Sequence, residues 1–355
     1  MANRVSRRAA LTGIAGVAGT LASAPGAEAA PNDVAISFAC RLYDRMLPLY
    51  TGAVQIPGVK LNFLPNADHR QVFDRMENHL EFDVSELSFS DFITMKSREK
   101  NIPLVALPVF PSRVFRHGFI FVNRKASIKG PKDLEGKRVG IPRWGETAVI
   151  WCRGMLQDEY ELDLSKVQWV TGELNRVGVH GSAPAAAPLK AFQIEANNSA
   201  HSLSELLEAG ELAAVMGAEL PVSLGKNPDI ERMFPNYREL EKDWYRRTKL
   251  YPIMHVISMR RDVHERHPWL ATNLVQAMQA SKMRALADME FTGSLLYMSP
   301  WLQSDIEEWR GVFGADPFPY GVEANRPSIN ASTRYLTEQG IIAAPMKAED
   351  LFVGV

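Results

Sequence analysis

The segment from Phe110 to Gly118 places two arginines and a histidine between two apolar stretches. The planar guanidinium groups of Arg113 and Arg116 are suited to bind a carboxylate through two parallel hydrogen bonds. The imidazole of His117 can gain or lose a proton near neutral pH. This combination fits a site for a small organic acid, although taken alone the segment is slightly more typical of a solvated basic loop.

Further polar side chains follow three expected strands, at points where helices are expected to begin. The three turns contain Arg45; Glu86, Ser88 and Ser90; and Trp144 and Thr147. Open parallel sheets bind ligands beyond the carboxyl ends of their strands, where the first N–H groups of the helices are unpaired. Each hydroxyl could serve only as an N-cap, and a tryptophan usually packs in a core, so the argument depends on three such turns at three strand ends.

His255 stands near the start of an apolar stretch that runs from Tyr251 to Met259. A histidine in such a stretch is usually a hydrogen-bonded core residue, but the expected location is a cleft floor opposite His117, so both interpretations stay open. The sequence His264–His267 lacks the spacing of a zinc-binding helix. No P-loop, nucleotide-binding glycine motif or nucleophile elbow is present. We therefore assign no metal-binding or cofactor-binding residue.

Short apolar stretches alternate with amphipathic ones along the chain, which predicts an α/β protein with mainly parallel sheets. We expect strands at 34–40, 59–63, 82–87, 104–110, 213–218 and 251–259. We expect helices at 44–49, 72–78, 146–159 and 262–288. Ser90 or Asp91 should cap the helix after the third strand, and Ser202 with Glu205 forms a capping box before another helix.

The expected strands and helices switch from one spatial group to another near residue 123 and switch back near residue 257, which predicts two lobes. We place lobe one at 31–120 plus 257–355, and lobe two at 121–256. The segments 119–123 and 255–259 would be the two crossover strands. In this arrangement the basic loop at 113–117 and His255 face each other across a cleft.

Residues 1–30 have the pattern of an export signal. Arg7 and Arg8 precede an apolar stretch rich in glycine and alanine, and an A-x-A cleavage pattern ends at Ala29. The paired arginines favour the twin-arginine route over the general secretory route, and they predict a periplasmic protein. Cys40 and Cys152 are expected to be buried, unpaired and in different lobes.

The overall charge balance also limits the partners. The chain has 40 lysines and arginines against 41 acidic residues, so no basic surface for nucleic acid is indicated. Beyond the signal, no apolar run approaches membrane-spanning length, so we expect no stable membrane insertion.

Four segments resemble the 4,5-dihydroxyphthalate decarboxylase family: Phe82–Ser88, Pro108–His117, Pro252–His255 and Pro319–Arg326. The resemblance covers roughly residues 35–350. This family is related to type-2 periplasmic binding proteins, so the resemblance implies a bilobal α/β fold with two crossover strands. It also implies decarboxylation of a hydroxylated aromatic carboxylate without a cofactor.

The resemblance further implies roles for the residues above. A ring hydroxyl supplies electrons, an acid protonates the ring carbon that bears the carboxylate, and CO2 leaves. His117 would be the proton donor, and Arg113 and Arg116 would bind carboxylates. Glu86 or His255 would deprotonate or orient the phenol.

Two features differ from the family. The family commonly has an acidic residue at the position of Ala213 and a basic one at Glu219, so one carboxylate clamp could be lost. The export signal is also unusual for a catabolic decarboxylase. The alternative function is therefore an exported solute-binding protein that delivers a small aromatic or other carboxylate to the permease of an ABC transporter.

On the sequence alone, the substitution His117→Gln is expected to abolish turnover and to spare binding. The measurement is CO2 release from a hydroxylated aromatic acid together with the binding constant of that acid. Unchanged turnover would remove His117 from the mechanism.

Overall fold

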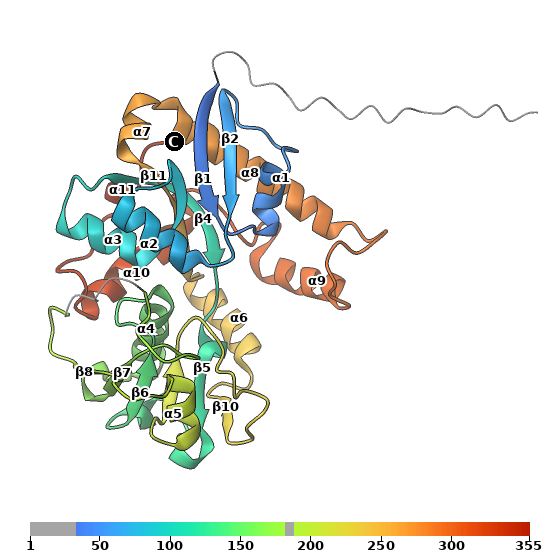
Figure 1. Ribbon diagram of the computed structural model, residues 1–355. Helices are drawn as coiled ribbons and strands as arrows, with labels where there is room; N and C mark the ends of the chain where they lie inside the picture. The colour runs from blue at the N-terminus through green and yellow to red at the C-terminus, as the bar shows by residue number, and fades with distance from the viewer. Residues whose placement is uncertain (1–32, 182–187) are drawn as a thin grey trace, which may run out of the picture.

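The structure, a computed structural model, describes residues 33–181 and 188–355. The expected export signal at 1–30 lies outside the described residues. The chain forms two lobes, each built around its own β-sheet (Figure 1). The expected bilobal α/β architecture is therefore confirmed.

Sheet A has the strand order β2-β1-β3-β11-β4. Its strands are β1 (Val34–Cys40), β2 (Val59–Pro65), β3 (Val84–Ser88), β4 (Leu104–Arg113) and β11 (Ile253–Arg260). Strand β1 runs parallel to β2 and β3, whereas β11 is antiparallel to both of its neighbours. The central strand β11 thus comes from a part of the chain far from the other four.

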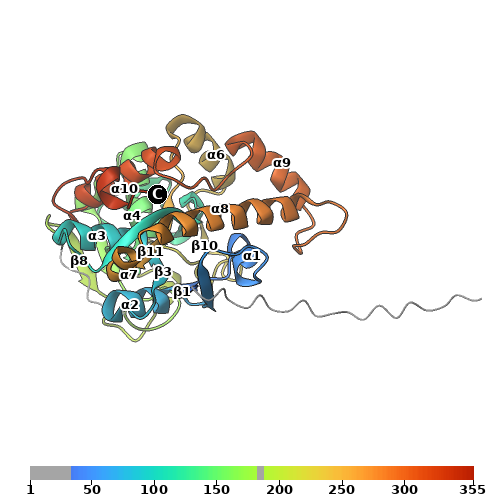
Figure 2. The same cartoon turned by 90° about the horizontal axis from the view of Figure 1, so that it is seen from above.

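Helices cover both faces of sheet A (Figure 2). The helices α2 (His69–His79) and α3 (Phe89–Arg98) pack on one face, and the long α8 (Trp269–Glu290) packs on the other. The alternation along β4 explains this division, because Leu104 and Ala106 belong to one core and Val105 and Leu107 to the other. The short helices are α1 (Leu47–Tyr50), α7 (Arg261–Arg266) and α11 (Ala348–Leu351).

Sheet B has the order β10-β5-β9-β6-β7-β8, with β6, β7, β8 and β9 parallel where they pair. Its strands are β5 (Ile120–Asn123), β6 (Arg138–Ile141), β7 (Gln168–Thr171), β8 (Gln193–Ala196), β9 (Ala214–Met216) and β10 (Ile230–Arg232). The accompanying helices are α4 (Thr147–Tyr160), α5 (Leu203–Ala209) and α6 (Tyr237–Thr248). The capping box of Ser202 and Glu205 at α5 is present as predicted.

The two connections between the lobes run side by side. The backbone N–H of Val114 donates to the carbonyl of Pro252 over 3.3 Å. Strand β11 lies wholly in sheet A and β5 in sheet B. The chain therefore crosses between the lobes at 114–119 and 249–252, just before the expected crossover strands 119–123 and 255–259. The lobe boundaries 31–120 plus 257–355 and 121–256 stay a proposal.

Other local details differ from the expectations. Ser88, not Ser90 or Asp91, caps α3, because its side chain accepts from the N–H of Asp91. The expected helix 262–288 is two helices, since α7 ends at Arg266 and α8 begins after Pro268. A proline lacks the N–H that would continue the first helix.

Both cysteines, Cys40 and Cys152, are buried and free, and they lie in β1 and α4. Within residues 33–181 and 188–355, no helix is both long and apolar enough to cross a membrane.

Two helices near the C-terminus complete the body: α9 (Leu302–Phe313) and α10 (Arg326–Glu338). Helix α10 packs against α4, so the last part of the chain contacts lobe two. The contact depends on Gly154 in α4, because a Cβ atom there would lie 2.5 Å from the ring of Tyr335. The hydroxyl of Tyr335 also donates to Asp158 over 2.7 Å, which fixes the ring in place.

We predict that Gly154→Ala destabilises the protein by about 1–3 kcal/mol, because the added methyl group overpacks the α4–α10 contact. The measurement is the free energy of unfolding in urea. The matched control is Gly311→Ala in α9, where no neighbour lies within 4 Å. That change should leave stability equal or raise it by about 0.5–1 kcal/mol. Equal effects of the two substitutions would contradict the packing argument.

Candidate functional site

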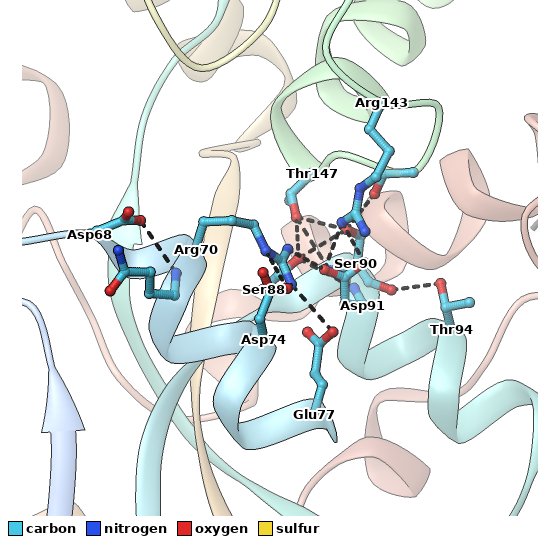
Figure 3. Close-up of polar contacts among 12 residues, drawn as sticks. Asp68, Arg70, Asp74, Glu77, Ser88, Ser90, Asp91, Thr94, Arg143 and Thr147 are labelled. Carbon is cyan, nitrogen blue, oxygen red and sulfur yellow. Dashed lines mark hydrogen bonds and ion pairs between the residues drawn. The ribbon is translucent and has the colours of Figure 1, made fainter. Parts of the chain in front are cut away.

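The first turns of α3 and α4 meet between the lobes (Figure 3). The hydroxyl oxygen of Thr147 lies 2.8 Å from that of Ser90 and 3.1 Å from that of Ser88. Ser90 also donates to the carbonyl of Gly145 over 2.8 Å. The N-terminal ends of two helices, with their partial positive charge, therefore face one another across three hydroxyl groups.

A small cavity lies beside this cluster and is lined from both lobes. Its volume is about 50 Å³. Three arginines and three histidines contribute to its wall: Arg70, Arg116, Arg143, His69, His180 and His255. Space of this size holds only a few water molecules, so the lobes must separate to admit an aromatic acid. The wall also contains the acidic Glu146. Arg116 is the wall arginine without an ion pair among the described residues, so it is the group that favours an anionic ligand.

Two of the arginines are already paired with acidic residues, and Arg70 also pairs with Asp74 at 2.5 Å. Asp91 of α3 accepts from Arg143 over 2.7 and 2.8 Å and from Arg70 over 3.2 Å (Figure 3). Burial alone would raise the pKa of the Asp91 carboxyl, but the two guanidinium groups outweigh burial and lower it. Arg143 comes from lobe two, so this ion pair also connects the lobes.

Arg116 differs from these two arginines because it has no carboxylate partner among the described residues. It is 5% exposed, and its Nε atom has no hydrogen-bond partner. Its other nitrogens contact the carbonyl of Gly217 at 3.5 Å and the sulfur of Met254 at 2.7 Å. A buried cation with no carboxylate in contact is costly, and a ligand carboxylate in the cavity would reduce that cost.

His255 contributes an imidazole whose orientation is fixed by Glu86. The register of β11 on β3 pairs His255 with Ser88, which places it at the cavity end of sheet A. Its Nδ1 lies 2.5 Å from Oε1 of Glu86, which also accepts from the hydroxyl of Tyr43 over 2.6 Å. The backbone N–H of Arg41 donates to the other oxygen over 3.1 Å.

This network keeps the Glu86 carboxylate ionised in a fully buried position. Burial would raise its pKa, but His255, Tyr43 and the N–H of Arg41 outweigh burial and hold the pKa at about 2. Nδ1 of His255 is therefore the hydrogen-bond donor to Glu86, and Nε2 is the ring nitrogen left for the cavity. The pair has the arrangement of a general acid–base held by a carboxylate.

His117 lies outside this cavity. It is 2% exposed, and its ring centroid lies 5.4 Å from that of Trp244 and 5.8 Å from that of Phe234. Burial, and then the charge of Arg247, lower its pKa to about 4. It does not face His255 across the cavity as we expected, because the short turn after Arg116 directs the imidazole into the core of lobe two.

Arg113 is likewise directed away from the cavity. Its Nη1 donates to the side chain of Asn325 and its Nη2 to the carbonyl of Tyr251, each over 2.6 Å. Its guanidinium group also lies 4.6 Å from the centroid of the Tyr251 ring. These contacts connect the crossing segments to the C-terminal part of the chain.

Arg45 and Trp144 also point elsewhere. Arg45 donates to the carbonyl of Pro111 and pairs with Asp44 at 2.9 Å, beside a separate apolar pocket. Trp144 is buried, and its indole N–H donates to the carbonyl of Gln339 over 3.1 Å. The guanidinium group of Arg153 stacks 3.6 Å from the Trp144 ring. Both residues therefore support the structure around the site.

Of the residues expected from the sequence, the cavity wall contains Ser88, Arg116, Thr147 and His255. Glu86 and Ser90 are hydrogen-bonded directly behind the wall. Sequence reasoning missed the five other charged or titratable residues of the wall: His69, Arg70, Arg143, Glu146 and His180. His69 and Arg70 begin α2 directly after β2, so the strand-end argument applied to the second strand would have found them.

The described part of the chain contains no group of three or more His, Cys, Asp or Glu residues arranged to hold a metal ion. The residues of the cavity wall can bind an anion and transfer a proton.

The 4,5-dihydroxyphthalate decarboxylase of Comamonas testosteroni is 32% identical to this chain over 318 residues, which cover 89% of this chain and 96% of that protein. This chain belongs to the 4,5-dihydroxyphthalate decarboxylase family. A second member of the family, from Pseudomonas putida, is 34% identical over 216 residues, which cover 61% of this chain and 83% of that protein. The family resemblance expected from the sequence is thus confirmed.

Further comparisons concern the fold. A family model described as NMT1/THI5 like matches residues 58–206. The periplasmic sulfonate-binding protein SsuA of Escherichia coli superimposes with a TM-score of 0.52 at 12% identity, covering 92% of this chain and 93% of that chain. The SsuA structure from Methylobacillus flagellatus gives 0.52 at 12% identity, with 91% and 92% covered. These structures show that this family member has the periplasmic-binding-protein fold.

The buried Glu86 predicts a particular dependence of stability on pH. Because its pKa is lower in the folded state than in an unfolded chain, it stabilises the protein above pH ~4.3, and the effect is lost as the pH falls toward 2. Glu86→Gln should therefore lower the free energy of unfolding by on the order of 2–3 kcal/mol at neutral pH, and the difference should shrink between pH ~4.3 and 2.

Urea unfolding at a series of pH values measures this difference. Glu211→Gln, which alters an exposed glutamate, is the matched control and should change stability by less than about 0.5 kcal/mol. A constant gap between the wild-type and Glu86→Gln curves down to pH 2 would contradict the assigned network.

Proposed function

We propose that this protein is a carboxy-lyase that decarboxylates a hydroxylated aromatic acid without a cofactor. One observation carries the proposal: the unpaired Arg116 and the imidazole held by Glu86 line the same cavity. The first supplies an anchor for a carboxylate, and the second supplies a proton. The family names of the relatives agree with this reaction.

In this proposal the substrate carboxylate binds at the meeting point of the two lobes. Arg116 supplies the charge, and the hydroxyls of Ser88 and Thr147 supply hydrogen bonds. The first N–H groups of α4 add further donors, because the N-cap side chain of this helix makes no capping hydrogen bond. The aromatic ring would then extend toward Met254 and Phe73, which also line the cavity.

The proton donor in this proposal is Nε2 of His255. Electrons from the ring hydroxyl raise the basicity of the ring carbon that bears the carboxylate, and the imidazolium protonates this carbon. The bond to the carboxylate carbon then breaks, CO2 leaves, and the electron pair of that bond restores the aromatic ring. The net reaction consumes one proton, which His255 regains from solvent, and the Glu86 carboxylate stabilises the charged imidazole throughout.

This assignment moves the role expected of His117 to His255. His117 is buried against Trp244 and away from the cavity, and its low pKa keeps it neutral at pH 7. Arg113, expected to bind a carboxylate, donates instead to Asn325 and to the carbonyl of Tyr251, outside the cavity wall. The geometry therefore supports Arg116 as the carboxylate anchor, with His255 and Glu86 as the proton-transfer pair.

A second function is supported by the pattern of residues 1–30 together with the periplasmic-binding-protein fold. The protein would then be exported to the periplasm by the twin-arginine route and would deliver a small aromatic carboxylate to the permease of an ABC transporter. This function uses the same anion site, but it gives no role to the buried pair of Glu86 and His255. We therefore rank it second.

To test the proposal, purified protein is incubated with hydroxybenzoates and hydroxyphthalates, and CO2 release and thermal stabilisation are recorded together. A ligand that prefers the folded state raises its stability, so stabilisation reports binding. We predict that His255→Gln lowers CO2 release at least about 100-fold while stabilisation by the substrate is kept.

The matched variant is His117→Gln, which should retain most of the turnover. Loss of CO2 release in His117→Gln with normal release in His255→Gln would overturn the assignment of the proton donor. Stabilisation of the wild-type protein without any CO2 release would favour the solute-binding function.

A further inference from the structure

Glu146 occupies the N-cap position of α4 but does not cap the helix. Its backbone is extended, with φ −64° and ψ 129°, yet its side chain makes no hydrogen bond to the first turn. Serine, threonine, asparagine and aspartate are the residues that favour this position, and glutamate is not among them. The side chain instead lines the cavity between the lobes.

The carboxylate of Glu146 is incompletely satisfied. Its Oε2 atom is buried and has no hydrogen-bond partner among the described residues. The wall around this oxygen is tight, since a Cβ atom added to Gly217 would lie 3.6 Å from Oε2 and 3.0 Å from Pro142. Burial raises the pKa of Glu146, which agrees with an oxygen that is cut off from solvent.

Glu146 and Arg116 are held on the same side of the cavity without forming an ion pair. Arg116 contacts the carbonyl of Gly217, and Glu146 lies against the same glycine. Neither residue forms an ion pair in the part of the chain that the structure describes, although the charge of Arg116 acts on Glu146 and lowers its pKa against the effect of burial. The wall therefore offers one site for an anion and, beside it, one buried oxygen that lacks a partner.

A ligand recovers the cost of an unpaired buried oxygen only if it brings a hydrogen-bond donor. A hydroxyl or amino group on the ring would do so. A second carboxylate near Glu146 would instead place two like charges together in a dry site, which is strongly unfavourable.

We propose that Glu146 is a specificity-determining residue that selects aromatic acids with a single carboxylate and a ring hydroxyl that donates to Oε2. The inference rests on the proposed function, since it uses the same cavity and the same carboxylate anchor. It sets the preferred ligand apart from a phthalate, which carries two carboxylates.

Isothermal titration calorimetry with four probes tests the proposal: 3,4-dihydroxybenzoate, benzoate, 4,5-dihydroxyphthalate and phthalate. The wild-type protein should bind 3,4-dihydroxybenzoate at least about tenfold more tightly than benzoate. Glu146→Leu should reduce this ratio to within about threefold, and should tighten binding of 4,5-dihydroxyphthalate by about tenfold relative to 3,4-dihydroxybenzoate. Glu146→Gln keeps the shape of the side chain and removes its charge. It should tighten binding of 4,5-dihydroxyphthalate to the same extent, and it should lower the preference for 3,4-dihydroxybenzoate over benzoate only in part.

Glu211→Gln is the matched control, because Glu211 is exposed and is not part of the cavity wall. It should leave all four affinities unchanged. The proposal would be overturned if both Glu146 variants had the same affinity ratios as the wild type. It would also be overturned if the wild-type protein bound phthalate as tightly as 3,4-dihydroxybenzoate.

The CO2 assay separates this outcome from the fate of the proposed reaction. Binding that depends on Glu146 without any CO2 release supports the inference and removes the decarboxylase function. CO2 release together with affinity ratios that do not depend on Glu146 supports the decarboxylase function and removes the inference about Glu146.

Discussion

The meeting of the first turns of α3 and α4 is the contact on which the site depends. Two helix N-termini that face each other bring together partial positive charges, which repel unless negative charge lies between them. Asp91 in the first turn of α3 supplies some of that charge, and its pairing with Arg143 draws lobe two onto lobe one. A ligand carboxylate would supply more of this negative charge. Ligand binding and closure of the lobes would therefore stabilise each other through the same electrostatic attraction.

A second constraint is the burial of Glu86. An ionised carboxylate inside a core is costly, and this one is retained because Tyr43, His255 and a backbone N–H satisfy it. A protein that only binds and releases a solute gains little from such a network. A protein that must hold one nitrogen of an imidazole toward a ring carbon gains a fixed orientation and a stabilised imidazolium. The fold is shared by binding proteins and enzymes, so this pair, and not the fold, points to catalysis.

Much of the fold follows from patterns within short stretches of the sequence. Strand β1 begins and ends where the apolar run does, and the capping box at Ser202 marks the start of α5. The break between α7 and α8 was missed, although Pro268 signals it, because the amphipathic pattern continues across the break. The cap of α3 was placed two or three residues late, since several hydroxyl and carboxylate side chains compete for that position.

The side chains of the site were harder to predict, for a physical reason. Arg113, Arg116 and His117 are close in sequence, but the turn between them sends one toward Asn325, one into the cavity and one into the core beside Trp244. Residue type and spacing cannot distinguish these directions, because they depend on neighbours from distant elements. Glu146 and Arg143 lie in a turn that sequence reasoning did single out, but Trp144 and Thr147 were chosen from it.

The position of β11 in sheet A has a consequence for how the protein is made. This strand, Ile253–Arg260, lies between β3 and β4, which both end before residue 114. Until residue 260 has left the ribosome, the two earlier strands have no partner between them, and their apolar edges stay open. All strands of lobe two lie between residues 120 and 232, so this lobe can assemble first. The order of synthesis therefore favours completion of lobe two before lobe one, whose sequence flanks it on both sides.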